Sequence, residues 1–302
     1  MNEAAPAAPE PCGSWPSPID AASVAAASIR FGQTAIRDGA IFWTESRPAE
    51  AGRSVLVRAT AGDETADLTP PPFNVRTRAH EYGGGAFVLL DDHGLAFCDD
   101  ADQQVHLLAP GRPTRRLTEL PAQRFADLCH DRRRGRLLAV REDHREGDID
   151  AVATIVAIDL ASGAQRVIAE GHDFFSNPTL SPDGSRLAWL SWDHPDMPWD
   201  ATTLWLATVG ADGSLGEPRR IAGGGSESVF QPSWSSSGEL HFVADRSGWW
   251  NLHRLRDDAV EPLWPMAAEF GEPQWVFGMS TYGFDGRGRI VCSFLQDAWS
   301  TL

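Results

Sequence analysis

Short apolar or alternating segments recur along the chain from about Ile29 onward, and they are rich in Val, Leu, Phe and Trp. Gly, Asp, Pro and Ser separate these segments, and no stretch has the long 3.6-residue period of an amphipathic helix. Alternation with a period of two is typical of β-strands, because successive side chains point to opposite faces. The pattern therefore predicts an all-β fold.

Two segments of the chain resemble each other at a constant offset. The first runs from Asn177 to Trp189 and the second from Gln231 to Phe242, and the matching positions are Pro178, Ser181 and Gly184 in one and Pro232, Ser235 and Gly238 in the other. Ser181-Pro182-Asp183-Gly184 predicts a hairpin turn, because Pro presets the first dihedral, Asp bonds the local backbone and Gly supplies a positive φ. A strand should precede this turn and another should follow it.

Gly-centred turns recur at a spacing of roughly 40 to 55 residues, which is the period of a four-stranded propeller blade with its loops. Besides the turns at Gly184 and Gly238, they are Asp38-Gly39, His93-Gly94, Arg134-Gly135 and Asp285-Gly286. The sequence thus predicts a β-propeller over 29–302, with Asp183-Gly184 and Ser237-Gly238 at equivalent turns. The expected blades are about 29–79, 80–120, 121–171, 172–224 and 225–268, with part of a sixth over 270–302.

Both ends of the chain differ from this repeat pattern. Residues 1–28 are rich in Ala and Pro and predict a mostly disordered leader in which a short helix can form. The chain ends soon after an apolar segment, Ile290 to Leu295, with no closing strand. We therefore expect an incomplete ring, and an open edge through which the protein can self-associate.

Composition excludes several classes of function. The formal net charge of -16 argues against a nucleic-acid partner, since the one dense basic run, Arg132 to Arg136, reads as a solvated turn. The chain has no lysine, which excludes Schiff-base chemistry and a phosphate-loop lysine. Its four cysteines form no C-x-x-C pair and no disulfide framework. Without a secretory signal or a membrane-spanning segment, we expect a cytoplasmic protein that contacts no membrane.

Four segments of this sequence resemble the prolyl oligopeptidase family of serine peptidases, in its dipeptidyl aminopeptidase and acylaminoacyl-peptidase branch. They are Trp43-Thr-Glu-Ser-Arg-Pro-Ala-Glu-Ala-Gly-Arg53, Val75-Arg-Thr-Arg-Ala-His-Glu-Tyr-Gly-Gly-Gly85, Ser191-Trp-Asp-His-Pro-Asp-Met-Pro-Trp-Asp200 and Ala244-Asp-Arg-Ser-Gly-Trp-Trp-Asn-Leu252. The resemblance covers nearly everything from Pro18 to Leu302. It implies an amino-terminal propeller that caps an α/β-hydrolase domain with a Ser, Asp and His triad.

The catalytic part of that family is not found in this sequence. No G-x-S-x-G elbow occurs, and the nearest segment, Gly223-Gly-Gly-Ser-Glu-Ser228, lacks the second glycine that lets a strand turn sharply into a helix. We therefore predict no catalytic residue and no α/β-hydrolase domain in this chain. The family's hydrolytic activity cannot be transferred, whereas its filtering and orienting of peptides can.

The resemblance places the segment before Gly83 at an innermost strand, where side chains can face the central channel. The candidate substrate-binding residues there are Arg76, Arg78, His80, Glu81 and Tyr82. A channel-facing Arg or Glu can pair with the carboxylate or the amino terminus of a peptide through charge-assisted hydrogen bonds. The alternative, and the commoner role, is that these side chains pair across blades and lock the ring.

A second candidate is the loop that contains Asp193, His194, Asp196, Trp199 and Asp200, which could hold a metal or an amine. Its spacing does not match a calcium loop. Two prolines, with Trp192 and Trp199, favour instead a rigid packed loop. Other histidines lack ligand spacing, so we predict no metal and no cofactor.

Trp249 and Trp250 are adjacent, and on a strand they would point to opposite faces. One is expected in the core between blades and the other on the opposite face.

These observations predict a non-catalytic propeller that gates or positions short peptides for a serine peptidase. Its expected partner is a peptide substrate, engaged through the missing hydrolase domain. The alternative is a stand-alone interaction module such as the TolB-type propellers, which share the Ser-Pro-Asp-Gly turns and bind proteins on the top face.

Overall fold

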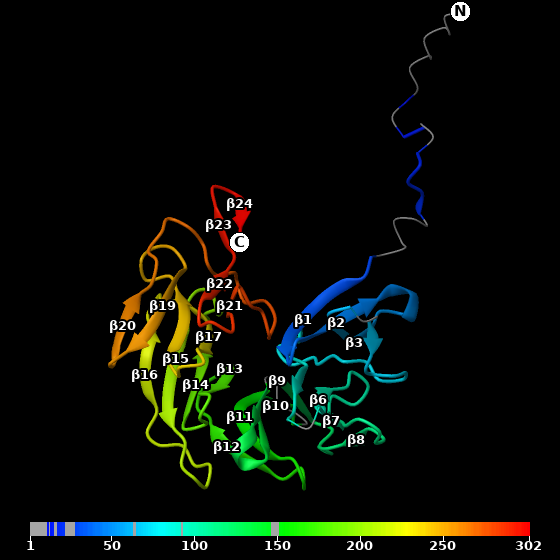
Figure 1. Ribbon diagram of the computed structural model, residues 1–302, viewed down its shortest axis with the longest axis horizontal. Helices are drawn as coiled ribbons and strands as arrows, with labels where there is room; N and C mark the ends of the chain where they lie inside the picture. The colour runs from blue at the N-terminus through cyan, green and yellow to red at the C-terminus, as the bar shows by residue number, and fades with distance from the viewer. Residues whose placement is uncertain are drawn as a thin grey trace, which may run out of the picture.

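The computed structural model describes the chain at residues 11, 13–14, 17–21, 28–62, 65–91, 93–145 and 151–302. Five four-stranded antiparallel sheets follow one another around a ring, which confirms the predicted all-β propeller (Figure 1). The described residues contain no α/β-hydrolase domain. The expected leader over 1–28 lies largely outside the described residues.

Each blade is an up-and-down meander in which neighbouring strands pair in chain order. Blade 1 consists of β1 (Arg30–Arg37), β2 (Ala40–Arg47), β3 (Arg53–Thr60) and β4 (Ala66–Asp67). Blade 2 consists of β5 (Phe87–Leu89), β6 (Leu95–Cys98), β7 (Val105–Leu108) and β8 (Arg115–Arg116). Blade 3 consists of β9 (Gln123–Asp131), β10 (Arg136–Asp143), β11 (Val152–Asp159) and β12 (Gln165–Ala169).

The remaining strands complete two more blades and part of a sixth. Blade 4 consists of β13 (Phe174–Leu180), β14 (Arg186–Trp192), β15 (Thr203–Thr208) and β16 (Arg219–Gly223). Blade 5 consists of β17 (Val229–Trp234), β18 (Leu240–Ala244), β19 (Asn251–Arg256) and β20 (Ala259–Pro262). Two separate hairpins follow, β21 (Tyr282–Phe284) with β22 (Ile290–Cys292), and β23 (Phe294–Gln296) with β24 (Trp299–Thr301).

The repeated turns found in the sequence join the first two strands of blades 4 and 5. Gly184 N donates to Ser181 O at 2.7 Å, and Gly238 N donates to Ser235 O at 2.9 Å. Asp183 accepts hydrogen bonds from the hydroxyls of Ser181 and Ser185, as the local role of Asp in such turns requires.

The core lies between the blades, because the central strands are buried on both faces. In β10, Leu137 and Ala139 pack towards blade 2, whereas Leu138 and Val140 pack towards blade 4. All four side chains are buried. This burial explains why the sequence reads there as a continuous apolar segment and not as an alternating one.

The innermost strands of blades 3, 4 and 5 each contain a bulge with one residue at positive φ: Asp127, Asn177 and Gln231. Two of these side chains connect to the next inner segment. Asp127 Oδ2 accepts the Asn177 N–H at 2.6 Å, and Gln231 Oε1 accepts the Thr281 N–H at 2.7 Å. The bulges thus aim polar side chains along the inner wall of the ring.

The chain between blade 5 and β21 reaches across the centre of the ring (Figure 1). We call residues 273–278 the axial segment. Its Phe277 N–H donates to Gly83 O at 2.9 Å, and Phe277 forms a parallel bridge with Gly84. A Cβ on Gly84 would overlap the Phe277 carbonyl, so this close approach requires glycine. The axial segment therefore joins blades that are far apart in sequence.

Two 3₁₀ turns lie between strands, η1 (Pro48–Glu50) in blade 1 and η2 (Arg132–Arg134) in blade 3. No described helix has the length and apolar character needed to cross a membrane.

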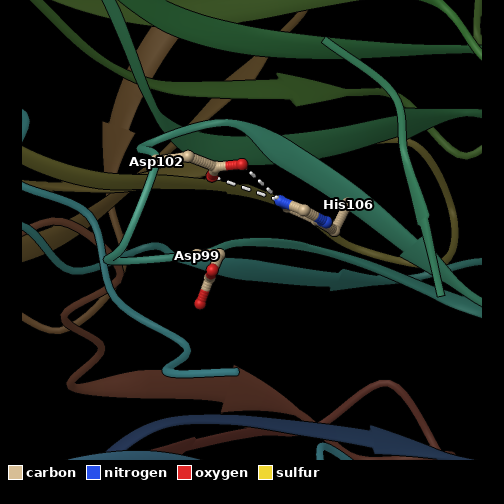
Figure 2. Close-up of side chains that lie close together, drawn as sticks. All are labelled: Asp99, Asp102 and His106. Carbon is tan, nitrogen blue, oxygen red and sulfur yellow. Dashed lines mark hydrogen bonds and ion pairs between the residues drawn. The ribbon is translucent and has the colours of Figure 1, made fainter. Parts of the chain in front are cut away.

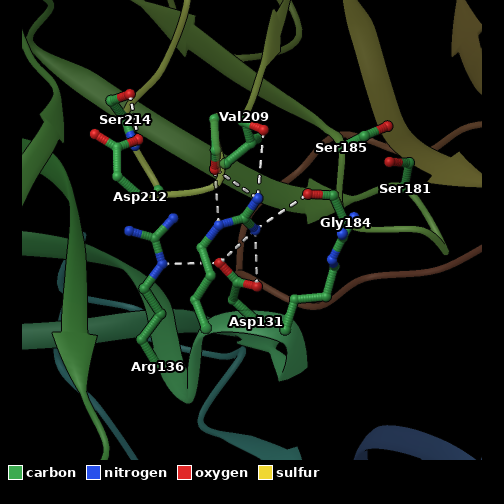
Figure 3. A network of polar contacts seen from close by, with 12 residues as sticks. Asp131, Arg136, Ser181, Gly184, Ser185, Val209, Asp212 and Ser214 are labelled. Atoms are coloured by element: carbon green, nitrogen blue, oxygen red, sulfur yellow. Dashed lines mark hydrogen bonds and ion pairs between the residues drawn. The ribbon is translucent and has the colours of Figure 1, made fainter.

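The basic run at η2 was expected to be a solvated turn, and for two of its arginines this is wrong. Arg134 and Arg136 both bind Asp131, whose side chain is 1% exposed (Figure 3). Arg134 also donates to the carbonyls of Gly184 and Gly210 in blade 4. Arg134 is buried because it satisfies this carboxylate and turn carbonyls that would otherwise lack donors, whereas Arg136 donates from Nε to Asp131.

The apolar segment from Ile290 to Leu295 forms parts of two strands and not one, β22 and β23. Ser293 N donates to Thr281 O at 2.8 Å, which extends the pairing of β21 with β22 by one residue. Leu295 then pairs with Glu269 and not with the strand that precedes it.

Candidate functional site

A cavity of about 420 Å³ lies where the turn before β5, strand β10, the loop after β14 and the axial segment meet. We call it the central pocket. Its described lining is His80, Glu81, Tyr82, Glu142, His144, Ala151, Ala153, Asp173, Phe174, Trp192, His194, Pro195, Asp196, Met197, Pro198, Trp199, Gln274 and Trp275. Aromatic rings and carboxylates dominate this wall, which is the composition of a site for an organic cation.

His80 lies at the base of this wall with its backbone at positive φ. Its ring packs against Phe277, Trp192 and Phe174, with centroid distances of 4.4, 5.5 and 5.3 Å. Burial lowers the pKa of His80 to about 4, which the charge of Glu142 opposes only in part. His80 is therefore neutral at pH 7, and its buried Nε2 has no hydrogen-bond partner.

Glu142 is a buried carboxylate near the end of β10, and it faces this histidine. Its Oε1 accepts the His80 backbone N–H at 2.8 Å, and its Oε2 contacts His144 Nε2 at 2.9 Å. The Nε2 of His80 is 3.9 Å from Oε1. A carboxylate has about four acceptor directions, so Glu142 retains the capacity to bind a further donor.

The loop after β14 is fastened by two crossed His–Asp contacts. Asp193 contacts His172 Nδ1 at 2.8 Å, and Asp173 contacts His194 Nδ1 at 3.1 Å. Asp200 accepts the Met197 N–H at 3.0 Å and so braces the loop internally. These contacts hold the aromatic side of the pocket in place.

The axial segment supplies the remaining wall. The Trp275 ring lies 4.4 Å from that of Trp199 and 6.0 Å from that of Tyr82. Gln274 donates from Nε2 to Asn177 Oδ1 at 3.2 Å, which fixes the orientation of its amide. Its Oε1 is buried without a partner, like the Nε2 of His80. Buried polar atoms without partners are uncommon, and two residues that line this cavity each carry one.

The structure brings together residues from both candidate segments of the sequence. His80, Glu81 and Tyr82 share the central pocket with His194, Asp196 and Trp199. Asp193 and Asp200 do not line the pocket, and their contacts with His172 and with the Met197 N–H hold the loop in place.

The two candidate arginines lie elsewhere. Arg78 turns away to Asp100, at 3.2 Å, and Arg76 is exposed. Glu81 lies at the pocket rim, where it pairs with Arg124 at 2.9 Å.

Sequence reasoning missed Glu142, Asp173 and Gln274. Glu142 lies in a strand of ordinary composition, and Gln274 was assigned to the start of a blade. Only long-range packing brings these residues to the pocket, so no local pattern in the sequence marks them.

A second cluster, Asp99, Asp102 and His106, has side-chain ligand atoms within 4.8 Å of one another (Figure 2). Asp102 already contacts His106 Nε2 at 3.1 Å and Arg116 at 3.6 Å, and Asp99 accepts the Asn74 N–H. These contacts satisfy the side chains within blade 2, and we assign no ion to them. The absence of a metal and of a cofactor stays a prediction.

Comparison with solved structures finds close similarity to two hydrolases. A puromycin-hydrolysing peptidase from Mycobacterium tuberculosis is 33% identical with a TM-score of 0.87, over 95% of this chain and 47% of that one. A puromycin hydrolase is 34% identical with a TM-score of 0.84, over 95% of this chain and 48% of that one. This chain therefore spans about half the length of each.

More distant similarity extends to the fold alone. A TolB-like protein from Agrobacterium tumefaciens is 17% identical with a TM-score of 0.52, over 78% of this chain and 80% of that one. No family model matches the sequence, and no curated protein matches it.

Proposed function

Because this chain corresponds to the propeller region of peptidases of the prolyl oligopeptidase family, we propose that it positions peptides for a serine peptidase domain. We further propose that the central pocket holds the free amino end of the peptide. The acyl transfer itself belongs to an α/β-hydrolase domain.

One observation carries this proposal: three residues that line one aromatic cavity each carry an acceptor. They are the carboxylate of Glu142, Nε2 of His80 and Oε1 of Gln274. An ammonium group has three N–H donors and a positive charge, and it gains from both acceptors and aromatic faces. We assign His80 the Nδ1-protonated tautomer, in which Nε2 accepts.

The axial segment favours a role in which the propeller holds a peptide over one in which the peptide passes through the centre of the ring. It crosses the ring from blade 5 to Gly83 and Gly84 and contributes Gln274 and Trp275 to the pocket wall. A peptide would therefore enter and leave the central pocket on the same face of the propeller. This refines the gating role expected from the sequence.

The alternative role as a stand-alone interaction module rests on similarity of fold alone. It does not require a free amine, so one experiment separates the two.

The test measures binding of phenylalanine amide and of N-acetyl-phenylalanine amide to this chain by isothermal titration calorimetry. We expect the free amine to bind at least tenfold more tightly at pH 7. Glu142→Gln should remove most of this preference, because the charge that attracts the ammonium is gone. The exposed Glu217 supplies the control, since Glu217→Gln changes the net charge equally.

A second variant distinguishes the loss of an acceptor from a folding defect. Gln274→Met keeps the volume and removes the acceptor, and thermal unfolding should show that it is folded. Equal binding of both amides, or an unchanged preference in Glu142→Gln, would overturn the proposal.

A further inference from the structure

A second cavity, of about 600 Å³, lies beside the central pocket, between blade 5 and the strands that follow it. We call it the lateral pocket. It is lined by Trp199, Asp245, Gly248, Trp249, Trp250, Glu269, Gly271, Glu272, Pro273, Thr281, Ser293, Phe294, Leu295 and Ser300. Trp199 belongs to both pockets, and its contact with Trp275 forms part of the wall between them.

The lateral pocket is acidic. Among the described residues that line it are three carboxylates and no basic side chain. Asp245 accepts the Ser228 N–H and Glu269 accepts the Trp250 N–H, each at 2.8 Å, so both carboxylates are held in fixed positions. The nearby Arg246 is engaged by Glu227 at 2.8 Å and does not line the cavity. A cation is the complementary ligand.

The two adjacent tryptophans give this cavity flat walls. Trp250 stacks on Phe230 with rings 12° from parallel, and Gly271 lies so close to its ring that an added Cβ would collide with it. Trp249 is 42% exposed. Both residues precede β19 and line the same pocket, so the expected placement on opposite faces of a strand is wrong; the pocket has instead one packed ring and one accessible ring.

We propose that the lateral pocket binds a guanidinium group, as carried by an arginine side chain of a peptide. A guanidinium group is planar, stacks on tryptophan and offers paired donors to carboxylates, whereas the ammonium of lysine is a compact, strongly hydrated charge. This protein already contains such a contact, since the Arg186 guanidinium lies 4.6 Å from the centre of the Trp234 ring.

This site does not depend on the central pocket. Because the two cavities share Trp199, a peptide with its amino end in one could extend a basic side chain into the other.

The test uses probes whose amino end is blocked, so that they offer no ammonium to the central pocket. N-acetyl-arginine amide and its neutral isostere N-acetyl-citrulline amide are titrated into the full chain by calorimetry. We expect at least tenfold tighter binding of the arginine probe. Trp249→Ala and Glu272→Gln should each weaken it about fivefold or more, since both side chains are exposed enough to be replaced without unfolding.

Two controls make the outcome decisive. Glu217→Gln, which lines neither pocket, should bind the arginine probe as the unaltered protein does. Glu142→Gln should also leave it unchanged, although this variant tests the proposed amine site. Equal binding of the two probes would overturn the proposal that the lateral pocket binds a guanidinium group. Loss of arginine binding in Glu142→Gln with no effect of Glu272→Gln would overturn it as well.

Discussion

At the scale of single residues, two buried groups on the inner wall have pKa values that are shifted in opposite directions. Asp127 is buried in a bulge of β9, and burial raises its pKa to about 6, although the backbone N–H groups of Asn177 and Gly278 act against this. His80 is buried at the central pocket, where burial lowers its pKa to about 4. Both shifts arise because an enclosed site disfavours the charged form.

Asp127 should therefore make the protein less stable as the pH rises. Its ordinary pKa is about 4, so between about pH 4 and 6 the folded state binds more protons than the unfolded state. The stability it contributes is present below about pH 4 and is lost as the pH rises through 6. In Asp127→Asn this dependence should disappear, and the wild-type advantage in unfolding free energy should fall across that range by up to about 3 kcal/mol.

Urea unfolding at half-unit pH intervals checks this, and His80→Gln provides a comparison of opposite sign. Because the folded pKa of His80 is depressed, its contribution is present above about pH 6.5 and is lost as the pH falls towards 4. A wild-type advantage over Asp127→Asn that stays constant from pH 4 to 6 would contradict the assigned role of Asp127.

The candidate residues show how much of the site can be predicted from local sequence. His80 and Tyr82 were singled out because glycines follow them, and Trp199 because prolines and carboxylates surround it; the structure places all three in one pocket. Arg78 comes from the same segment but turns to Asp100, because the turn before β5 directs neighbouring side chains differently. A partner such as Glu142, 62 residues away from His80, can be found only from the folded ring.

At the scale of elements, arginines on hairpin turns connect blades 1, 3 and 4 each to the next blade. Arg37 of blade 1 donates to the carbonyls of Leu89 and Leu90, Arg134 of blade 3 to that of Gly184, and Arg186 of blade 4 to that of Gly238. Each donor lies on or next to the turn between the first two strands. A guanidinium group suits this position because it can serve several carbonyls at once.

Arg134→Lys should therefore destabilise the protein although it keeps the charge. The side chain of Arg134 is 10% exposed and reaches two blade 4 turns as well as Asp131, whereas an ammonium group cannot span these acceptors. We expect a loss of about 2 kcal/mol in unfolding free energy, from carbonyls left without donors.

Chemical denaturation checks this, with Arg133→Lys as the matched control. Arg133 is the preceding residue, is exposed and donates only to the Asp183 carbonyl among the contacts described, so its replacement should cost under about 0.5 kcal/mol. Equal losses in the two variants would show that Arg134 does not connect the blades.

The elements were the most predictable part of the fold. The Ser-Pro-Asp-Gly turn and the two-residue alternation are local signals, and they gave the four-stranded blades directly. Two elements were misjudged for a shared reason. The buried Arg134 donates to the carbonyl of Gly184 in the next blade, and Leu295 pairs with Glu269 outside its own hairpin; local patterns contain neither partner.

At the scale of the whole molecule, the first blade exposes an apolar face. Phe31 and Ile36 on β1 are 74% and 78% exposed, and Ile36 lies opposite Ile41 in the ladder with β2. The corresponding faces between the inner blades are packed against a neighbour. An exposed apolar face on a sheet favours association with another molecule.

We therefore predict that this chain self-associates through blade 1 despite its net charge of -16. At about 0.15 M salt, charges are screened beyond roughly 8 Å, so the negative charge opposes approach at long range but only weakly opposes contact between apolar faces. Sedimentation velocity at rising protein concentration should show species larger than a monomer. Ile36→Glu, which places a charge in the middle of the face, should shift the protein to monomer and leave its thermal unfolding nearly unchanged. Val167→Glu, on the outer strand β12 of blade 3, adds the same charge elsewhere and should leave association intact. If both variants behave alike, or if the unaltered chain remains a monomer at every concentration, blade 1 is not the contact. The net negative charge of the molecule is then enough to keep these exposed apolar side chains from associating.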